Sequence, residues 1–345
     1  MSPSPIQHAI QRVLAGNKPT AEELEAALHP ILRGEASDVE IAGLLVALAT
    51  QPVDGPTLAA AARVLRLHRV AVHPEVRPLI DTCGTGGDGA GTFNISTASA
   101  FVVAAAGAAV AKHGNRGVSS KVGSADVLES LGCKLELVSG AAQELLDAIG
   151  FVFMFAPSFH PAMRHVGPVR KALGVRTLFN LLGPLSNPAL AEYQVLGVFA
   201  QGYTLPMAEA LRELGSEGAL VVHCEGMDEI GLHGVTRGHR LFEGEIRSFE
   251  LKPEDLGLER TPLDRLAGGD NERNAVLLRE AIAGKVGPCA DVVALNAGAA
   301  LFVAGMAESI EAGFVKAREL MRAGKVERVL ARYVKSSTRM AKVAV

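Results

Sequence analysis

The chain has 345 residues, of which 48% are hydrophobic and 21% are charged, a composition typical of a globular protein that buries a large core. Its formal net charge of -3 argues against a general nucleic-acid or membrane-surface binder, so any anion-binding site has to be local. The four cysteines stand far apart without a C-x-x-C pair, and the N-terminus has no signal-peptide pattern, which favours a reducing cytoplasm without a zinc ribbon or a disulfide framework.

The first part of the chain has the periodicity of helices only. Thr20 with Glu23, and Ser37 with Glu40, form capping-box signals, and each pair precedes apolar residues at helical spacing. We therefore predict a small helical domain over residues 1–74.

From residue 75 onward, short apolar runs alternate with helical stretches, a pattern that indicates βαβ units and a mostly parallel sheet. A hairpin around Glu243-Gly244-Glu245 would add two strands, and three helices from about Asp291 close the chain. We predict an α/β domain over residues 75–345. The expected strands are Leu79–Cys83, Ala108–Ala111, Lys134–Leu137, Phe151–Phe155, Gln194–Phe199 and Ala219–His223. The expected helices between them are Thr97–Ala106, Ala125–Leu131, Ala141–Ile149 and Leu205–Leu214.

A glycine-rich loop, Asp81–Gly89, follows the first expected strand. Its four glycines permit positive φ and close approach of a ligand, and successive backbone N–H groups can hold phosphate oxygens. A tight strand-to-helix turn is the weaker alternative. Asn94, Ser96 and Thr97 then stand where a helix begins, and its free N–H groups favour phosphate, although each residue could be only a cap.

Residues 84–89 also satisfy G-x-G-x-x-G, so a Rossmann dinucleotide site has to be weighed. A polar segment separates these glycines from the next helix, and Lys112 and His113 stand where the fingerprint has an acidic residue. Asp88, inside the fingerprint, would repel a pyrophosphate unless a cation or a sugar hydroxyl is its partner. A dinucleotide site is therefore disfavoured.

A basic loop, Ala111–Ser120, follows the next expected strand. Loops at the carboxyl ends of parallel strands face one crevice, so this loop and the glycine-rich loop should lie together. Lys112 and Arg116 would balance part of the charge of a polyphosphate. Ser124 should cap the helix that follows and offer a third anion site. The alternative for each residue is a solvated loop.

Two later segments carry charged groups. His160–Arg170 and Arg176–Pro188 place basic and titratable residues near apolar ones. Arginine recognises carboxylates at two points, although any one of these arginines could form a surface ion pair.

Asp228 and Glu229 follow another expected strand. Taken alone they suggest a solvated turn, but beside two phosphate-type loops they suit Mg²⁺, which prefers oxygen ligands.

These segments recur together in one protein family. They are Gly84–Asp88, Asn94–Thr97, Lys112–Arg116, Ser119-Ser120, Gly123–Asp126, His160–Met163, Arg170, Arg176–Pro188, Gly226–Glu229 and Leu266–Gly269. In their order and over nearly the whole chain, they resemble the anthranilate phosphoribosyltransferases.

The resemblance implies a nucleoside phosphorylase/phosphoribosyltransferase-like α/β fold, with a small helical domain beside a larger α/β domain and the site in the cleft between them. Part of residues 160–190 would return to the helical domain, and the protein would be a homodimer. The implied reaction of tryptophan biosynthesis moves 5-phosphoribosyl from phosphoribosyl pyrophosphate (PRPP) to the amine of anthranilate, with Mg²⁺, in two ions, as cofactor. Neither a nucleic acid nor a membrane is expected as a partner.

The resemblance also implies site residues. Anthranilate would contact Gly84, Asn115 and Arg170, and magnesium would contact Ser96, Asp228 and Glu229. PRPP would contact Gly84, Gly87, Asp88, Thr92, Asn94, Ile95, Ser96, Thr97, Lys112, His113, Gly114, Asn115, Arg116, Gly117, Val118, Ser119, Ser120 and Ser124. One departure is Gly231, where relatives often carry Ser; it affects only local turn chemistry.

The chemistry explains why no catalytic base is assigned. Breaking the bond from C1 of ribose to pyrophosphate develops negative charge on the leaving group, which cations and N–H groups stabilise. The aromatic amine is neutral at pH 7 and needs positioning more than a strong base. His113 and His160 lie near the right loops, and each could only orient substrate.

Two alternatives have different requirements. A pyrimidine nucleoside phosphorylase uses free phosphate and would not need the adjacent carboxylates of Asp228 and Glu229. A related non-catalytic nucleic-acid-binding protein should lack the intact glycine loop and show a basic surface.

Overall fold

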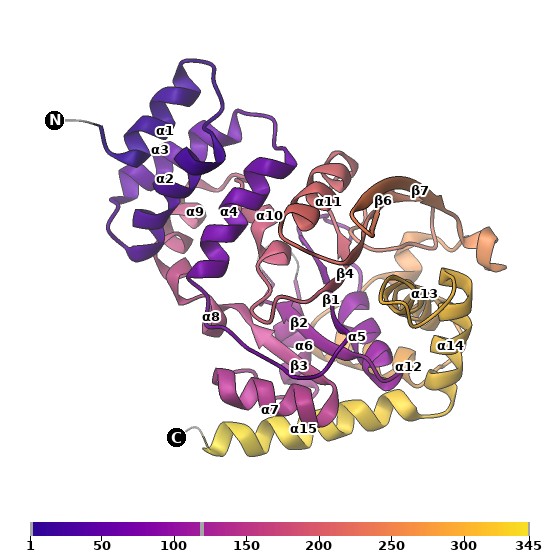
Figure 1. Cartoon of the computed structure of the whole chain (residues 1–345). Coiled ribbons are helices and arrows are strands. Elements are labelled where there is room, and N and C mark those ends of the chain that lie inside the picture. Colours follow the sequence, from indigo (N-terminus) through magenta and orange to yellow (C-terminus); the bar gives the residue numbers. More distant parts are fainter. Residues whose placement is uncertain (1–2, 118–120, 344–345) are drawn as a thin grey trace.

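A computed structural model describes residues 3–117 and 121–343 of the chain (Figure 1). Four helices form a bundle at its N-terminal end: α1 (Pro5–Leu14), α2 (Ala21–Arg33), α3 (Asp38–Ala49) and α4 (Gly55–Leu67). The two predicted capping boxes are present. The Thr20 hydroxyl accepts a hydrogen bond from Glu23 N while the Glu23 carboxylate accepts one from Thr20 N, and Ser37 and Glu40 do the same. Local hydrogen bonding therefore fixes where α2 and α3 begin.

The rest of the chain is built around a seven-stranded sheet with the order β3-β2-β1-β4-β5-β6-β7. β1 to β5 are parallel, and β6 and β7 continue the sheet as an antiparallel hairpin. The predicted fold class, a helical domain with a mostly parallel α/β domain, is confirmed. The strands are β1 (Leu79–Gly84), β2 (Ala109–Gly114), β3 (Phe151–Phe155), β4 (Tyr193–Gly197), β5 (Gly218–Cys224), β6 (Thr236–Phe242) and β7 (Glu245–Leu251).

Helices cover both faces of the sheet, so its central strands are buried almost throughout. Successive side chains of β4 and β5 alternate between two apolar clusters. Val195 and Leu220 belong to the cluster shared with α5 and α13, whereas Leu196 and Val221 belong to the cluster shared with the N-terminal bundle. Because successive side chains point to opposite faces of the sheet, β4 and β5 each contribute to both cores.

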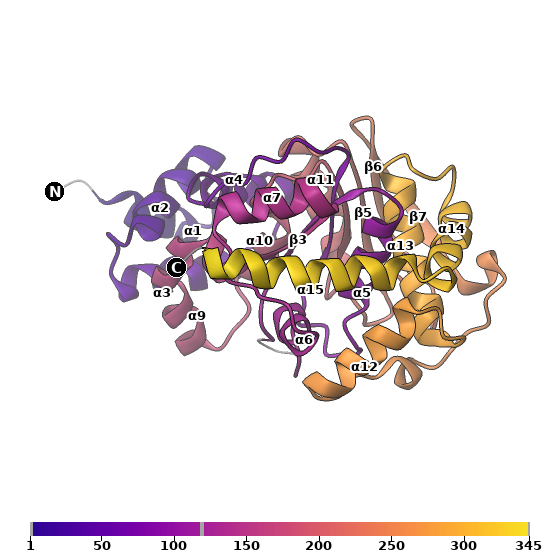
Figure 2. The same cartoon turned by 90° about the horizontal axis from the view of Figure 1, so that it is seen from below.

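The remaining helices are placed as follows. In Figure 2 the long last helix, in yellow, runs beside α7 and beneath the sheet. The bounds are α5 (Ile95–Ala105), α6 (Ser124–Ser130), α7 (Ser139–Ile149), α11 (Thr204–Glu213), α12 (Asn271–Ile282), α13 (Pro288–Val303), α14 (Ile310–Arg322) and α15 (Lys325–Val343), with short 3-10 turns η2 (Gln201–Tyr203), η3 (Pro253–Leu256) and η4 (Leu263–Leu266). Within the described residues, no helix is both long enough and apolar enough to span a bilayer.

Two predictions about local structure are wrong, and one helix was not predicted. Lys134–Leu137 is not a strand: Leu135 and Leu137 are buried, but Lys134 N donates to the Ser337 hydroxyl of α15 instead of to the sheet. Ser124 does not cap α6, because it is the first helical residue, and its hydroxyl donates to a loop carbonyl. The helix that was not predicted is α12.

A segment of short helices leaves the α/β layer after β3. It consists of α8 (Ala156–Phe159), η1 (Pro161–His165), α9 (Gly167–Leu173) and α10 (Phe179–Leu185). η1 packs on α2, α9 packs on α3, and α10 packs on α4. Val166 and Val169 belong to the same buried cluster as the core of the N-terminal bundle, so residues distant in sequence complete that bundle.

Candidate active site

The glycine-rich loop after β1 is held open by backbone conformations that other residues adopt poorly. Gly87 has φ +77°, in the left-handed region where a side chain adds strain. Its carbonyl accepts a hydrogen bond from Arg176 Nη2 at 2.5 Å. The Arg176 guanidinium lies 4.0 Å from the centre of the Phe199 ring, a cation–π contact. The loop is thus supported by the segment between α9 and α10.

An acidic turn after β5 meets this loop. Asp228 Oδ2 accepts a hydrogen bond from Gly86 N at 2.8 Å, and Asp228 N donates to Asp88 Oδ2 at 3.1 Å. Glu229 Oε1 accepts one from Ser96 N, at the start of α5, at 3.0 Å. Residues predicted for PRPP and for magnesium are therefore brought together from three loops at one edge of the sheet.

The two carboxylates of this turn are crowded. Asp228 and Glu229 keep some exposed surface, but protein surrounds their carboxylate groups. Burial, followed by the charges of Asp88 and Glu229, raises the pKa of Asp228 well above its ordinary value. Burial also raises the pKa of Glu229 to about 7, although Lys112 opposes this. A cation would relieve the repulsion that causes part of these shifts.

The donor set fits magnesium better than a softer metal. Carboxylate and hydroxyl oxygens from Ser96, Asp228 and Glu229 are hard ligands. Among the described residues, no group of three or more His, Cys, Asp or Glu side chains could hold a metal by itself. An ion here would need further oxygen ligands from water or from substrate phosphates, which is the ordinary coordination of Mg²⁺.

Lys112 lies beneath the phosphate-type loops. It is only 2% exposed, and its ammonium donates to Thr82 O and, at 3.3 Å, to the Ser96 hydroxyl. Buried Asp81 is close to it; burial raises the pKa of Asp81 to about 6, with Lys112 as the main opposing charge. Asn187 also donates to Asp81 Oδ2 at 2.7 Å. Lys112 therefore supplies positive charge from below the start of α5.

Two buried histidines lie next to each other at the end of β2 and the start of η1. The rings of His113 and His160 have centroids 5.0 Å apart. Burial lowers the pKa of His113 to about 3 and that of His160 to about 4, so both imidazoles are neutral at pH 7. Neither His160 ring nitrogen, nor His113 Nε2, has a hydrogen-bond partner among the described residues. These atoms are buried, so a substrate would reach them only if the surrounding side chains moved.

The basic loop is already partly neutralised. Arg116 is exposed and forms ion pairs with Asp126 at 3.2 Å and with Glu129, and the Glu129 hydrogen bond raises the pKa of Arg116. Asp126 Oδ2 also accepts from Gly117 N and Gly123 N. In this arrangement the two carboxylates offset the positive charge of Arg116. The predicted residues Val118, Ser119 and Ser120 lie outside the described residues.

Arg170, on α9, is half-buried. Its guanidinium lies 5.8 Å from the centre of the Phe179 ring, and burial lowers its pKa. No carboxylate of the described residues lies within ion-pairing distance of it. A substrate carboxylate would suit such a group, but no hydrogen bond links Arg170 to Asn115 or Gly84, the other residues predicted to hold anthranilate.

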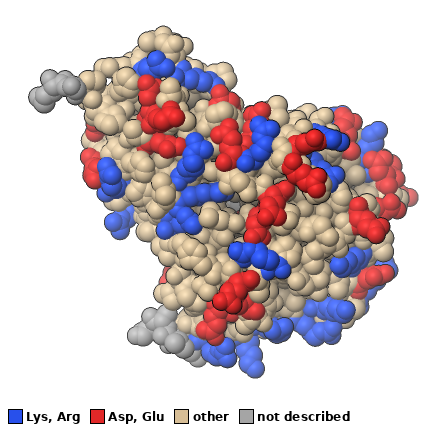
Figure 3. Space-filling model, in the orientation of Figure 1, with Lys and Arg blue, Asp and Glu red and all other residues tan. Residues whose placement is uncertain are grey.

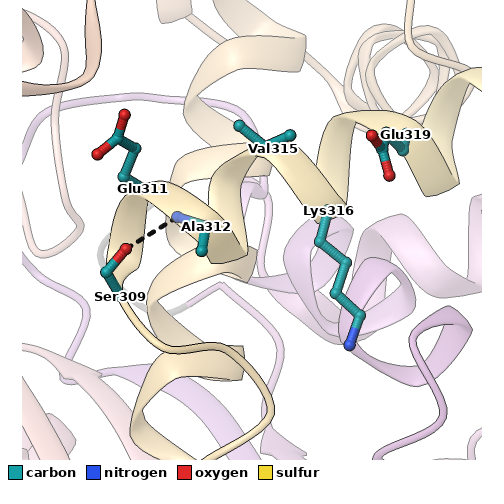
Figure 4. A pocket seen from close by; sticks show the side chains of 6 residues that line it. All are labelled: Ser309, Glu311, Ala312, Val315, Lys316 and Glu319. Carbon is teal, nitrogen blue, oxygen red and sulfur yellow. Dashed lines mark hydrogen bonds between the residues drawn. The ribbon is translucent and has the colours of Figure 1, made fainter.

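Charge is otherwise mixed over the surface. Lys and Arg are interspersed with Asp and Glu over the face shown in Figure 3. A hollow of about 580 Å³ lies on α14, lined by Ser309, Glu311, Ala312, Val315, Lys316 and Glu319 (Figure 4). Its lining comes from one helix and its cap, and none of the motifs predicted from the sequence reaches it. The charged and polar residues of the candidate site are concentrated at the carboxyl ends of β1, β2 and β5.

Comparisons with known proteins agree with this geometry. The helical bundle domain of a glycosyl transferase family matches residues 7–68, and the a/b domain of a glycosyl transferase family matches residues 76–327. An anthranilate phosphoribosyltransferase of Thermus thermophilus is 48% identical over 327 residues, 94% of this chain and 98% of the relative. One from Desulfatibacillum aliphaticivorans is 46% identical over 316 residues, 91% of this chain and 94% of the relative.

Solved structures lead to the same group. The crystal structure of anthranilate phosphoribosyltransferase from Thermus thermophilus matches with a TM-score of 0.91 at 47% identity, covering 96% of this chain and 99% of that one. The Saccharomyces cerevisiae enzyme in complex with PRPP and Mg matches with a TM-score of 0.89 at 27% identity, covering 98% and 99%. The same yeast enzyme in complex with 4-fluoroanthranilate has a TM-score of 0.88 at 27% identity, covering 97% and 98%.

Proposed function

This chain belongs to the anthranilate phosphoribosyltransferase family, and from that premise we propose how its residues divide the work of the reaction. The enzyme is a pentosyltransferase of tryptophan biosynthesis. It moves the 5-phosphoribosyl group of PRPP to the amine of anthranilate, giving N-(5-phosphoribosyl)anthranilate and pyrophosphate. The observation that supports our assignment most directly is the hydrogen bond between Gly86 and Asp228, which joins a phosphate-type loop to an acidic turn.

PRPP lies against the glycine-rich loop, the start of α5 and the basic loop after β2. Gly87 and its neighbours let backbone N–H groups approach the phosphates, and the start of α5 adds the positive end of a helix there. Lys112 contributes a positive charge from below. The residues assigned to PRPP are Gly84, Gly87, Asp88, Thr92, Asn94 to Thr97, Lys112 to Ser120, and Ser124.

Magnesium is the cofactor, and we assign two ions to the complex with PRPP. Ser96, Asp228 and Glu229 supply oxygen ligands, and the raised pKa values of the two carboxylates are what crowded acidic groups have before a cation neutralises them. When bound, the metal neutralises charge that develops on the pyrophosphate leaving group.

Anthranilate lies on the other side of the cleft, where Arg170 binds its carboxylate and Asn115 and Gly84 complete the contacts. Because the aromatic amine is neutral at pH 7, these residues act by positioning it at C1 of the ribose. The neutral imidazoles of His113 and His160 orient the substrate, and neither is assigned as a general base.

We also propose a homodimer formed through the helical domain. After the acidic residues of its first turn, α3 contains only apolar residues from Ile41 to Ala49, and Val39 and Val46, seven positions apart, are 81% and 45% exposed. Residues seven apart share a helix face, and a second copy of the same face is the natural partner in a symmetric dimer.

The domains are assigned as residues 1–74 and 75–345. The four cysteines are free thiols, which suits the cytoplasm.

An assay of anthranilate fluorescence tests the reaction. We expect the fluorescence to fall only when PRPP and Mg²⁺ are both present, with pyrophosphate released in equal amount. A chelator should stop the reaction, and excess Mg²⁺ should restore it. Phosphorolysis of a pyrimidine nucleoside without anthranilate turnover would instead support a nucleoside phosphorylase.

A further inference from the structure

The C-terminal Leu266–Gly269 motif has no part in the binding scheme above, yet it pairs with the PRPP loop. Phe93 N donates to Leu266 O at 3.0 Å, and Gly268 N donates to Gly91 O at 2.9 Å. These bonds hold the segment before α12 against the segment before α5. In both views α12 lies near α5 and α6, and it packs on each of them. The motif therefore borders the proposed phosphate site without belonging to it.

One buried side chain connects the two segments. Asn274, the fourth residue of α12, is 2% exposed. Its Oδ1 accepts a hydrogen bond from Gly269 N at 2.7 Å, and its Nδ2 donates to Asn94 Oδ1 at 3.0 Å. Asn94 Nδ2 in turn donates to Val122 O at 3.3 Å. Two carboxamides thus form a relay from the C-terminal motif to Val122, between the basic loop and α6.

Backbone groups fix the direction of this relay at both ends. Gly269 N–H can only donate, so the Asn274 oxygen has to face it and the Asn274 amide nitrogen has to face Asn94. Val122 C=O can only accept, so Asn94 has to turn its own nitrogen toward Val122 and its oxygen toward Asn274. The donor and acceptor roles of these backbone groups therefore determine the orientation of both carboxamides.

Close packing at Gly268 protects the relay. A β-carbon at Gly268 would lie 2.7 Å from Asn274 Oδ1 and 3.0 Å from Thr92 O, so any larger residue would displace Asn274 or the loop. Asn94 also occupies the N-cap position of α5 but makes no side-chain capping bond there. Its side chain is committed to the relay, although asparagine is a favoured N-cap.

We propose that Asn274 is a positioning residue for PRPP: it fixes the orientation of Asn94 and, through it, the spacing between the start of α5 and the basic loop. This inference rests on the proposed role of Asn94 in PRPP binding. The Asn274 side chain bonds to Gly269 and Asn94 and to none of the proposed metal ligands or anthranilate residues, so its effect should be confined to PRPP.

Steady-state kinetics of Asn274→Ala and Asn274→Asp, with each substrate varied separately, test the proposal. Loss of a neutral hydrogen bond should raise KM for PRPP about 5- to 10-fold, with KM for anthranilate unchanged. Asn274→Asp is the sharper variant, because its carboxylate can still accept from Gly269 N but presents an acceptor to Asn94 Oδ1. It should be at least as impaired as Asn274→Ala, despite keeping one of the two bonds.

Two controls separate positioning from loss of packing. Ile282→Val removes a methylene group from a buried side chain of the same helix, and should lower the melting temperature without changing KM for PRPP. Asn271→Ala replaces an exposed asparagine one turn earlier and should change neither quantity. A thermal melt of every variant shows how much stability each has lost.

A double-mutant cycle with Asn94→Ala decides whether Asn274 acts through Asn94. We expect Asn274→Ala to have almost no further effect on KM for PRPP once Asn94 is alanine. Additive effects, equal changes in both KM values, or Asn274 variants with normal KM for PRPP would overturn the proposal. If Asn94→Ala itself leaves KM for PRPP unchanged, the binding role of Asn94 is wrong, and the relay loses its proposed purpose with it.

Discussion

The carboxylate of Asp228 accepts a hydrogen bond from the backbone N–H of Gly86 at 2.8 Å. Gly86 lies in the loop after β1 and Asp228 in the turn after β5, so the bond crosses over the end of β4 in the sheet order. A β-carbon at Gly84 would collide with the same carboxylate. The loop proposed to hold phosphate thus meets a carboxylate, and a cation bound between this carboxylate and the phosphate would offset their repulsion.

Replacing both carboxylates of the acidic turn should abolish most activity without unfolding the protein. For Asp228→Asn with Glu229→Gln we expect turnover to fall ~100-fold or more, the scale associated with removing electrostatic stabilisation of a developing charge. The raised pKa values of both groups mean that their ionised forms oppose folding above their unfolded pKa values. The melting temperature at pH 7 should therefore stay the same or rise.

The control for this variant is Glu259→Gln, at an exposed glutamate in the segment between η3 and η4, which should be neutral in both measurements. Full activity of the double variant, or of the wild-type enzyme in excess chelator, would disprove the metal assignment.

Gly87→Ala should weaken PRPP binding more than it weakens folding. The left-handed backbone of Gly87 (φ +77°) costs an alanine about 1 kcal/mol, and the added methyl group would also block approach of the phosphates. Gly16→Ala is the matched control, because Gly16 has φ +79° and open space around it, in the helical domain. Calorimetric titration with PRPP and Mg²⁺ should show weaker binding only for Gly87→Ala; equal affinities would mean that the loop is only a turn.

Local signals in the sequence were sufficient where structure depends on neighbours in the chain. The Thr20–Glu23 box and the strand before Gly84 are examples, since capping and apolar runs are short-range patterns. The acidic turn and the glycine loop could be placed at one sheet edge, because parallel strands carry their loops to the same side.

Long-range partners could not be predicted in this way. Leu135 and Leu137 alternate as in a strand, but the backbone N–H of Lys134 beside them donates to Ser337 of α15, 203 residues later, instead of to a neighbouring strand. Arg116 was expected to face an anion. Its ion pair with Glu129 depends on how α6, which carries Glu129, packs against the loop. Asn94 and Asn274 are separated by 180 positions, and nothing in either local pattern points to the other.

The two buried histidines should make stability fall in mild acid. The unfolded chain binds protons at its histidines near pH 6.5, whereas His113 and His160 in the folded state do so only near about 3 and 4. Their contribution is complete above pH 6.5 and is lost as pH falls toward about 4, by up to ~3 kcal/mol per pH unit for the pair.

Urea unfolding at pH 7 and pH 5 measures this effect. His160→Gln should lose less stability than the wild type between these pH values, and His73→Gln, at an exposed position, should behave as wild type. NMR titration provides an independent check, because either buried ring titrating near pH 6.5 would contradict the prediction.

Interrupting the apolar face of α3 should dissociate the proposed homodimer. Val46→Glu places a charge on the face that Val39 and Val46 share, and burying an unpaired carboxylate in an interface is strongly unfavourable. Light scattering after gel filtration should give twice the chain mass for the wild type and the single chain mass for the variant. Val286→Glu, at a position 87% exposed in the α/β domain, is the control. A monomeric wild type would refute the dimer.

Arg170→Ala should weaken the use of anthranilate selectively. Arg170 is half-buried with its guanidinium near Phe179 and no carboxylate of the described residues as a partner, so a substrate carboxylate can take that place. Truncating one side of a buried charge pair loses ~2–5 kcal/mol, which corresponds to at least ~25-fold in the apparent affinity for anthranilate. Arg170→Lys should rescue poorly, because an ammonium cannot present two parallel donors. Arg164→Ala, an exposed arginine of the preceding turn, is the control. Kinetics with each substrate varied separately decides the matter: a variant that keeps its KM for anthranilate and loses affinity for PRPP would move Arg170 to the phosphate side of the cleft.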